Sequence, residues 1–324
     1  MTGLLESLTG AASIGLAVNI GANNSAAEMG PAYGAGVRSR RQALALIAIF
    51  CTAGAVIAGG RVLHMVGHGL LGDGALTANR FAALSVVVSA MALIGLANAL
   101  RLPLSTAHAV VGAVVGLGLF YGTVNLPVVY GVVAWWVATP AAALVMSYLL
   151  GRLVYPPLTR AIAALGSERA VYRALGWSAT LSGCWMAFSA GSNSLAKALG
   201  PAVGAGVFSP ATGAVVGGLG MAAGALLLGG RMMKTVGKEI TSMCPLCAVM
   251  VEVVAASIVF TASRFGMPVS LAEIVTCSVI GFGCAANGVK DTANNHHVRR
   301  MMVLWPAAPV AAAGIALGVQ FALR

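Results

Sequence analysis

Residues 21–37 read GANNSAAEMGPAYGAGV, and residues 191–207 read GSNSLAKALGPAVGAGV. The two stretches agree at ten of seventeen positions and begin 170 positions apart, which is about half of the chain. GGRVLHMVG at 59–67 and GGRMMKTVG at 229–237 repeat at the same offset. This pattern predicts an internal duplication. In membrane proteins, interrupted apolar segments at corresponding places in two halves indicate a transport site.

The composition excludes a soluble protein. Only 8% of the residues are charged, 59% are hydrophobic and the mean hydropathy is +0.92, whereas a soluble domain carries about 25% charged residues. The chain therefore requires a lipid bilayer. Its net charge of +11 is spread between apolar spans, which is typical of a positive-inside membrane protein and not of a nucleic-acid-binding protein.

Ten apolar stretches are candidate membrane helices, since a crossing needs about 20 apolar residues. We predict an all-α polytopic membrane protein with one repeat at 1–150, a cytoplasmic linker at 151–176 and a second repeat at 177–324. The stretches at 104–121 and 269–286 either span the bilayer or are re-entrant. The ten predicted segments are 4–36 (interrupted), 43–59, 81–99, 104–121, 128–150, 177–207 (interrupted), 209–230, 243–261, 269–286 and 301–321.

The predicted segments also indicate the topology. Five crossings per half is an odd number, so the two halves run in opposite directions and form an inverted repeat with a central site. If the linker is cytoplasmic, fourteen Lys and Arg residues lie in inside loops and four lie outside. The positive-inside rule then predicts that both termini are outside, in a plasma membrane of the bacterial inner-membrane type.

The paired motif has the chemistry of an anion site. Asn and Ser disfavour helix interiors and favour N-caps, so we predict that each motif breaks its helix and starts a half-helix ending near Gly30 or Gly200. Helix N-termini present unpaired N–H groups and a positive dipole end to an anion. The alternative is a pair of kinks with asparagines bonded across helices. The polar residues of this predicted substrate site are Asn23, Asn24, Ser25, Ser192, Asn193 and Ser194.

A further repeated motif reads PLSTAH at 103–108 and PVSLAE at 268–273. Together with the paired motif it resembles the inorganic phosphate transporter (PiT) family, whose repeats carry GAND and PVSTTH. The resemblance covers essentially the whole chain. It implies an anion symporter with a pseudo-two-fold axis in the membrane plane, and it adds Ser105, Thr106 and Ser270 to the predicted substrate site.

The sequence departs from the family at one informative place. Where the family motif has Asp, this chain has Asn24 and Ser194. Asn and Ser supply hydrogen-bond donors without charge, and a carboxylate would repel sulfate, which is fully deprotonated near neutral pH. The chain therefore resembles the sulfate permease branch of the family. We predict proton-coupled import of sulfate; thiosulfate or phosphate as substrate, and sodium as coupling ion, are the alternatives.

Ionisable residues within apolar spans are functional candidates by default. Lys197 either neutralises a divalent anion or forms a bridge with Glu28. Glu252 matches a family carboxylate position, and is either a coupling group or a buried, hydrogen-bonded acid. His108 and Glu273 occupy corresponding places in the two repeats. They are the leading proton-coupling candidates, because histidine titrates near neutral pH; otherwise they orient the neighbouring hydroxyl groups.

Other functions are less well supported. There is no GxSxG or HExxH motif, so we do not predict a serine hydrolase or a metalloprotease. We predict no cofactor and no metal site, because Cys244 and Cys247 form the only close cysteine pair and no second pair completes a zinc site. A passive anion channel is the main rival to a carrier, and a homodimer is compatible with the sequence.

Overall fold

The computed structural model describes residues 2–34, 36–72, 75–78, 80–99, 104–230, 244–288 and 296–322. Within them the regular structure is helical, apart from one bridge between Leu71 and Val124. The chain is a multi-pass membrane protein, because six helices are long and apolar enough to cross a bilayer. The elements are α1 (Thr2–Gly34), α2 (Arg40–Ala58), α3 (Gly60–His64), η1 (Met65–Gly69), α4 (Ala75–Ala78), α5 (Arg80–Ala99), α6 (Thr106–Tyr121), α7 (Leu126–Leu149), η2 (Leu150–Val154), α8 (Tyr155–Ala163), α9 (Glu168–Gly204), α10 (Pro210–Gly224), η3 (Ala225–Gly229), α12 (Pro245–Arg264), α13 (Leu271–Asn287) and α15 (His296–Ala322).

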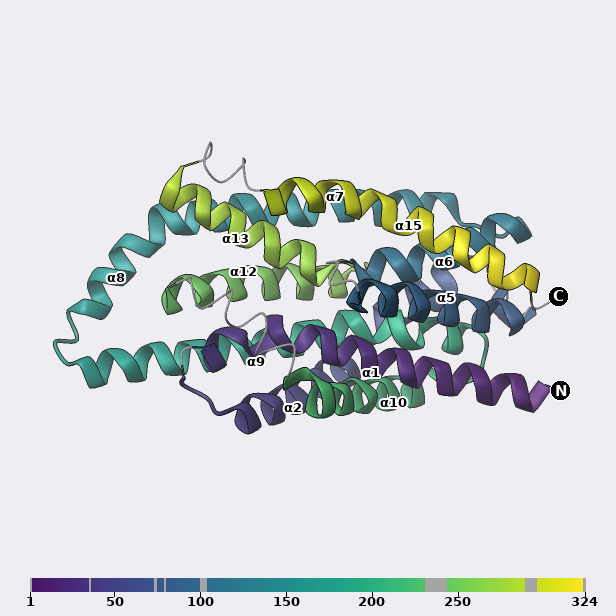
Figure 1. The fold of residues 1–324 in the computed structure, drawn as a ribbon, viewed down its shortest axis with the longest axis horizontal. Helices are drawn as coiled ribbons and strands as arrows, with labels where there is room; N and C mark the ends of the chain where they lie inside the picture. Colours follow the sequence, from purple (N-terminus) through teal and green to yellow (C-terminus); the bar gives the residue numbers. More distant parts are fainter. Residues whose placement is uncertain are drawn as a thin grey trace.

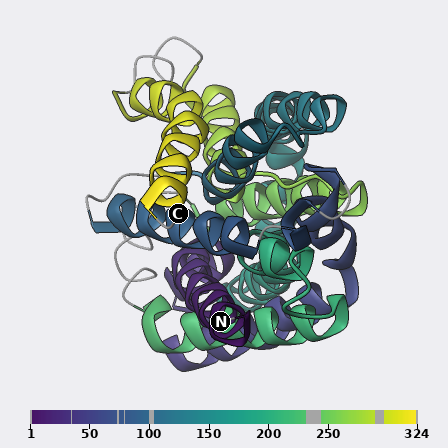
Figure 2. The ribbon, with the colours of Figure 1, turned by 90° about the vertical axis from the view of Figure 1, so that its right-hand side faces the viewer.

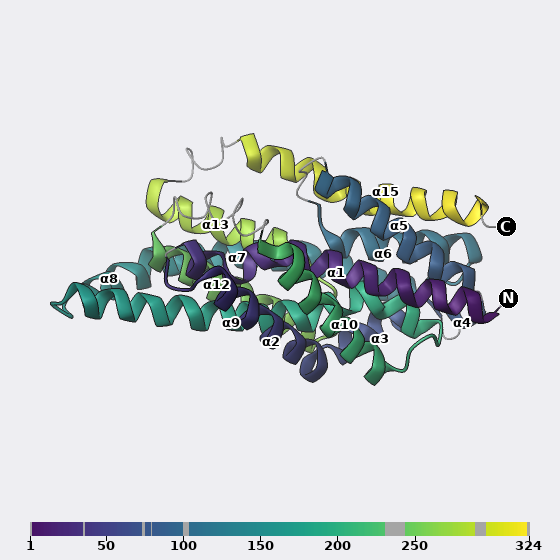
Figure 3. The ribbon, with the colours of Figure 1, turned by 60° about the horizontal axis from the view of Figure 1, so that its bottom comes forward.

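The long helices run roughly along one axis of an elongated bundle (Figure 1). Both termini lie at one end, which Figure 2 views directly. Helix α8 and the start of α9 project at the opposite end (Figures 1 and 3). This arrangement agrees with an odd number of crossings in each half. Which end faces the cytoplasm stays a prediction, and the basic residues at 231–238 lie outside the described residues.

Helix α9 is the inner helix of the bundle. It is 37 residues long, and all but three of its residues from Ala179 to Gly204 are buried. Helices α1, α2 and α12 pack around it. Because its inner face carries many polar side chains, α9 is not among the six helices that are apolar enough over their length to cross a bilayer. Its burial in protein explains how a polar segment is accommodated inside a bilayer.

Glycines of the paired motif bring helices into close contact. A Cβ added at Gly21 of α1 would overlap the backbone of Met221 in α10. A Cβ added at Gly191 of α9 would overlap the backbone of Cys51 in α2. Gly191 lies 170 positions after Gly21, and Met221 lies 170 positions after Cys51. The two contacts are therefore equivalent, since the same offset relates the paired motifs. Small residues at helix crossings allow such approach in membranes.

Two helical hairpins enter the bundle from opposite ends. Helices α6 and α13 have 16 and 17 residues, or about 25 Å at 1.5 Å per residue, which is short of the 30 Å hydrocarbon core. The α5–α6 pair lies toward the termini, and the α12–α13 pair toward the other end (Figure 1). The segments at 104–121 and 269–286 are therefore shorter than a full crossing, which favours the re-entrant alternative. If all ten predicted segments crossed the bilayer, Arg264 would lie in an outside loop. In the structure it lies at the turn between α12 and α13.

The predicted break at the paired motif is wrong. Helix α1 is continuous through Asn23–Ser25, and α9 is continuous through Ser192–Ser194. The polar side chains do not interrupt the helices because their hydrogen bonds are satisfied in other ways. Ser25 Oγ donates to the Gly21 carbonyl one turn earlier at 2.8 Å, and the asparagines bond across helices, as described below. The motif glycines provide close packing and not a break.

Candidate functional site

The helix N-termini at the centre belong to the two hairpins. Ser105 caps α6, and its Oγ accepts the His108 N–H at 3.2 Å. Ser270 caps α13, and its Oγ accepts the Glu273 N–H at 3.3 Å. The other N–H groups in each first turn have no partner within their own helix, and both positive dipole ends point into the centre. Helix N-termini therefore do converge at the centre, but they begin at Ser105 and Ser270 and not at the paired motif, where they were predicted.

The two N-termini meet through His108 and Glu273. His108 Nδ1 lies 3.3 Å from Glu273 Oε1 and 3.1 Å from the Trp305 carbonyl oxygen. Both side chains are buried. Both capping serines, Ser105 and Ser270, lie close enough to the Glu273 carboxylate to interact with it. The structure thus joins the two leading coupling candidates into one polar cluster.

The paired motif lies beside this cluster. Asn24 Nδ2 donates to Ser194 Oγ at 3.0 Å, and Lys197 Nζ donates to the same hydroxyl at 3.4 Å. Lys197 is the largest of the fully buried side chains, and it interacts electrostatically with both Glu273 and His108. Asn24 and Ser194 are equivalent residues of the two motifs. Their direct contact is what a two-fold axis passing between them would produce.

Asn193 fixes the turn that precedes α13. Its Nδ2 donates to the Met267 carbonyl at 2.9 Å and to Ser263 Oγ at 3.1 Å. Its Oδ1 accepts the Val269 N–H at 3.1 Å. Ser192 Oγ also reaches Ser263, at 3.0 Å. Asn193 is therefore a positioning residue for the α13 N-terminus, and Ser263 is a site residue that the sequence pattern did not reveal.

Trp136 is the other residue of the site that the sequence analysis did not select. Its Nε1 donates to the Pro268 carbonyl at 2.8 Å, and its ring lies 4.0 Å from the His108 ring between centroids. A signal was present, because Trp136 and Pro140 are repeated as Trp305 and Pro309. The tryptophan holds both hairpin tips, since it contacts one residue from each.

Two of the predicted coupling residues lie away from this cluster. Glu252 accepts a 2.5 Å hydrogen bond from Ser182, which is twelve residues before Ser194 in α9 and so about 18 Å along the helix. The Glu28 backbone lies beside Gly183 at a similar level of α9. Within the described residues, both carboxylate oxygens of Glu28 lack a hydrogen-bond partner, and no bridge forms to Lys197.

The remaining predicted site residues have different environments. Thr106 is buried at the first position of α6, next to the capping serine, whereas Asn23 is half-buried in α1. Cys244 and Cys247 are joined by a disulfide at the start of α12. Within the described residues, no group of three His, Cys, Asp or Glu side chains is arranged to hold a metal ion.

The central cluster combines hydrogen-bond donors with positive charge. The Asn24 amide, the serine hydroxyls, the Lys197 ammonium and two helix N-termini converge from α1, α9, α6 and α13. Backbone N–H groups at a helix N-terminus with a dipole behind them favour a negative ligand. Among the described residues of the cluster, Glu273 is the acid, and it has a titratable partner in His108. The arrangement is suited to an anion whose binding depends on protonation.

The chain is similar in sequence to known permeases and transporters. The phosphate transporter family matches residues 20–316. The sulfate permease CysP of Bacillus subtilis is 36% identical over 92% of this chain and 82% of its own length. A chloroplastic inorganic phosphate transporter of Arabidopsis thaliana is 25% identical over 90% of this chain and 67% of its own length.

A solved structure, described as the sodium-dependent phosphate transporter, has the same fold. It superimposes with a TM-score of 0.83 at 23% sequence identity, and the match covers 100% of this chain and 99% of that one. The family match includes the paired motif, both hairpins and the Trp136 and Trp305 segments. This chain is a membrane transporter that belongs to the phosphate transporter family.

Proposed function

We propose that this protein is a secondary active transporter that imports an inorganic oxyanion, most favourably sulfate, together with protons. The observation that carries the proposal is the meeting of two helix N-termini beside Lys197, Asn24 and Ser194. Its 36% identity to a protein named as a sulfate permease supports sulfate. Phosphate is the alternative substrate, because other relatives are named as phosphate transporters.

The donor set supports a fully deprotonated anion. Hydrogen phosphate carries a proton that needs an acceptor, and sulfate carries none near neutral pH. Asn24 and Ser194 stand at the positions where the family motif has Asp, and each offers a donor without a negative charge. An Asp at either position would lie next to the anion and repel it. Sulfate, or an anion of similar charge such as thiosulfate, therefore matches the site better than phosphate.

The His108–Glu273 pair supports coupling to protons. A proton on Glu273 removes a negative charge beside the anion, and a proton on His108 adds a positive one. Either change strengthens anion binding through the Coulomb interaction. By thermodynamic linkage, the bound anion strengthens proton binding by the same factor. Joint binding of proton and anion is the requirement for symport.

Energetics require such coupling for import. A divalent anion entering a cell that is 100 mV negative inside costs about 2.3 kcal/mol per charge. At least two positive charges must accompany each anion to remove that cost. His108 and Glu273 at the centre, and Glu28 and Glu252 toward the α8 end, are the buried groups that would carry protons. Sodium is the alternative, and the loss of both motif Asp residues argues against it.

The symmetry of the contacts supports an inverted repeat. Equivalent residues touch each other at Asn24–Ser194 and again at His108–Glu273. We infer that a pseudo-two-fold axis passes through both pairs and relates repeats at 1–150 and 177–324. Alternating access would then be an exchange between two related arrangements of the halves. A plasma-membrane location with both termini outside, and a homodimer, remain predictions.

Competition binding tests the substrate. Purified protein is loaded with radiolabelled sulfate and challenged with unlabelled sulfate, thiosulfate or phosphate. We expect sulfate to compete better than phosphate at neutral pH. Stronger competition by phosphate would mean that the missing Asp pair does not determine selectivity, and that phosphate is the preferred substrate.

A further inference from the structure

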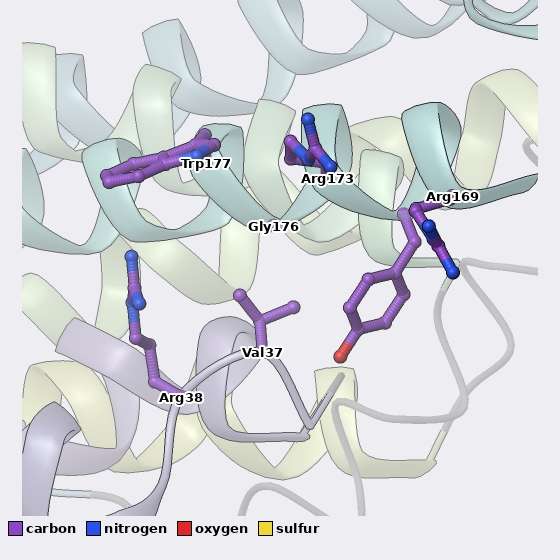
Figure 4. Close-up of a pocket in the computed structure, with 7 residues that line it drawn as sticks. Val37, Arg38, Arg169, Arg173, Gly176 and Trp177 are labelled. Carbon is purple, nitrogen blue, oxygen red and sulfur yellow. The ribbon is translucent and has the colours of Figure 1, made fainter.

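A pocket lined by three arginines lies far from the central site, at the end of the bundle where α8 and the start of α9 project (Figure 1); Figure 4 shows its lining residues. Its volume is about 270 Å³. It lies between the α1–α2 connection of the first repeat and the first turns of α9, where the predicted linker leads into the second repeat. The residues that matter are Arg38, Arg169, Tyr172, Arg173, Gly176 and Trp177.

The connection between α1 and α2 supplies one side of the pocket. Arg38 Nε donates to Thr180 Oγ1 of α9 at 3.0 Å, and its guanidinium lies 5.1 Å from the Trp177 ring centre. The two terminal nitrogens of this guanidinium carry four further N–H donors. Tyr172 donates to the Gly36 carbonyl at 3.3 Å, which holds a second aromatic ring at the edge of the pocket. These contacts hold the α1–α2 connection against α9 beside the pocket.

The charge of the pocket favours an anion. It is lined by three arginines, and none of its seven described lining residues is acidic. Arg169 and Arg173 are four residues apart on α9, so they lie on the same helix face and repel each other. A bound anion would relieve that repulsion. Guanidinium groups bind phosphate oxygens through paired hydrogen bonds, which makes arginine the preferred residue for phosphate groups.

The depth of the pocket places it near lipid headgroups. Helix α9 has 37 residues and is about 55 Å long, against about 30 Å for the hydrocarbon core. Its first turns therefore extend beyond the core. Tyr172 and Trp177 are both 57% exposed there, and such aromatic residues are enriched at the membrane–water interface. Basic pockets between helices at this level can bind anionic lipid headgroups.

We propose that this pocket binds a phosphate group, supplied either by an anionic phospholipid headgroup or by free inorganic phosphate. The bound group would lie between the α1–α2 connection, which carries Arg38, and the first turns of α9, which carry Arg169 and Arg173. The site is separate from the central cluster, and it does not depend on which anion is transported.

The test compares two double variants with the same change in charge. Arg169→Gln/Arg173→Gln removes pocket arginines that are exposed on α9, so the fold should survive. Arg152→Gln/Arg160→Gln is the control, because both arginines are exposed near α8 and neither lines the pocket. Each protein is titrated with short-chain phosphatidylglycerol, with the matching phosphatidylcholine, or with inorganic phosphate. Binding is followed by native mass spectrometry and by the shift in unfolding temperature.

We expect the pocket variant to bind its ligand roughly thirty-fold more weakly than wild type, since each arginine near an anionic surface contributes about five-fold. The control variant should retain wild-type affinity. A loss confined to phosphatidylglycerol identifies a lipid as the source, and a loss confined to inorganic phosphate identifies the free anion. Any inorganic phosphate that binds at the central site should bind equally well to both variants, because neither variant changes that site. Equal binding by the two variants, or an equal loss in both, would overturn the proposal.

Discussion

Replacing Asn193 with alanine tests how the site is held together. The Asn193 side chain makes hydrogen bonds to the Met267 carbonyl, the Val269 N–H and the Ser263 hydroxyl. The alanine variant leaves the Met267 and Val269 backbone groups without these partners. Val269 is fully buried, and each buried group left unpaired costs about 1–3 kcal/mol. Local destabilisation of the turn before α13 should therefore be about 2–6 kcal/mol.

The consequence for function follows from the position of this turn. It sets where Ser270 and the α13 N-terminus lie relative to the anion. Losing one well-placed hydrogen bond to a charged ligand costs about 1.5–3 kcal/mol, or roughly ten- to a hundred-fold in affinity. We therefore expect Asn193→Ala to bind sulfate that much more weakly while still inserting into the membrane.

The assay measures the sulfate dissociation constant and the unfolding temperature of purified protein. Ser178→Ala is the matched control, because Ser178 donates only within α9, to the Ala174 carbonyl at 2.9 Å. The control should bind sulfate as wild type does. If folded Asn193→Ala binds sulfate with wild-type affinity, the α13 N-terminus does not hold the anion and the reasoning fails.

Three further predictions concern selectivity, coupling and packing. Asn24→Asp should weaken sulfate binding, most at high pH, and unchanged competition against phosphate would contradict this. His108→Gln and Glu273→Gln should each abolish accumulation driven by a pH gradient but spare sulfate counterflow; retained accumulation would remove that residue from the coupling. Gly191→Ala should lower the yield of folded protein, because its Cβ would overlap backbone of α2, whereas Gly95→Ala meets nothing within 4 Å and serves as the control in size-exclusion chromatography.

The sequence predicted the arrangement of the helices well because the repeat is explicit. Apolar length located the helices, and the 170-residue offset paired them. The helix break was mispredicted for a physical reason. Asn24 and Ser25 are poor helix formers on average, but their polar groups bond across to α9 and back to Gly21. Intrinsic helix propensity does not include such tertiary partners.

The candidate site could be predicted only in part. The motifs pointed to Ser105, Ser270, His108 and Glu273, because these residues recur at matching places. The contact between the two hairpin tips depends on α6 and α13 being too short to span, which hydropathy alone did not decide. Ser263 has no repeated motif around it. Its role comes from a crossing of α9 and α12 that only the three-dimensional packing reveals.

Sulfate uptake into proteoliposomes tests the central claim most directly. Vesicles without sodium are given an inward proton gradient, and internal radiolabelled sulfate is measured against the external concentration, with a proton ionophore as the control. The account predicts accumulation above the external concentration that collapses when the ionophore is added. Simple equilibration with no response to the gradient would indicate a channel, and accumulation that requires sodium would contradict proton symport.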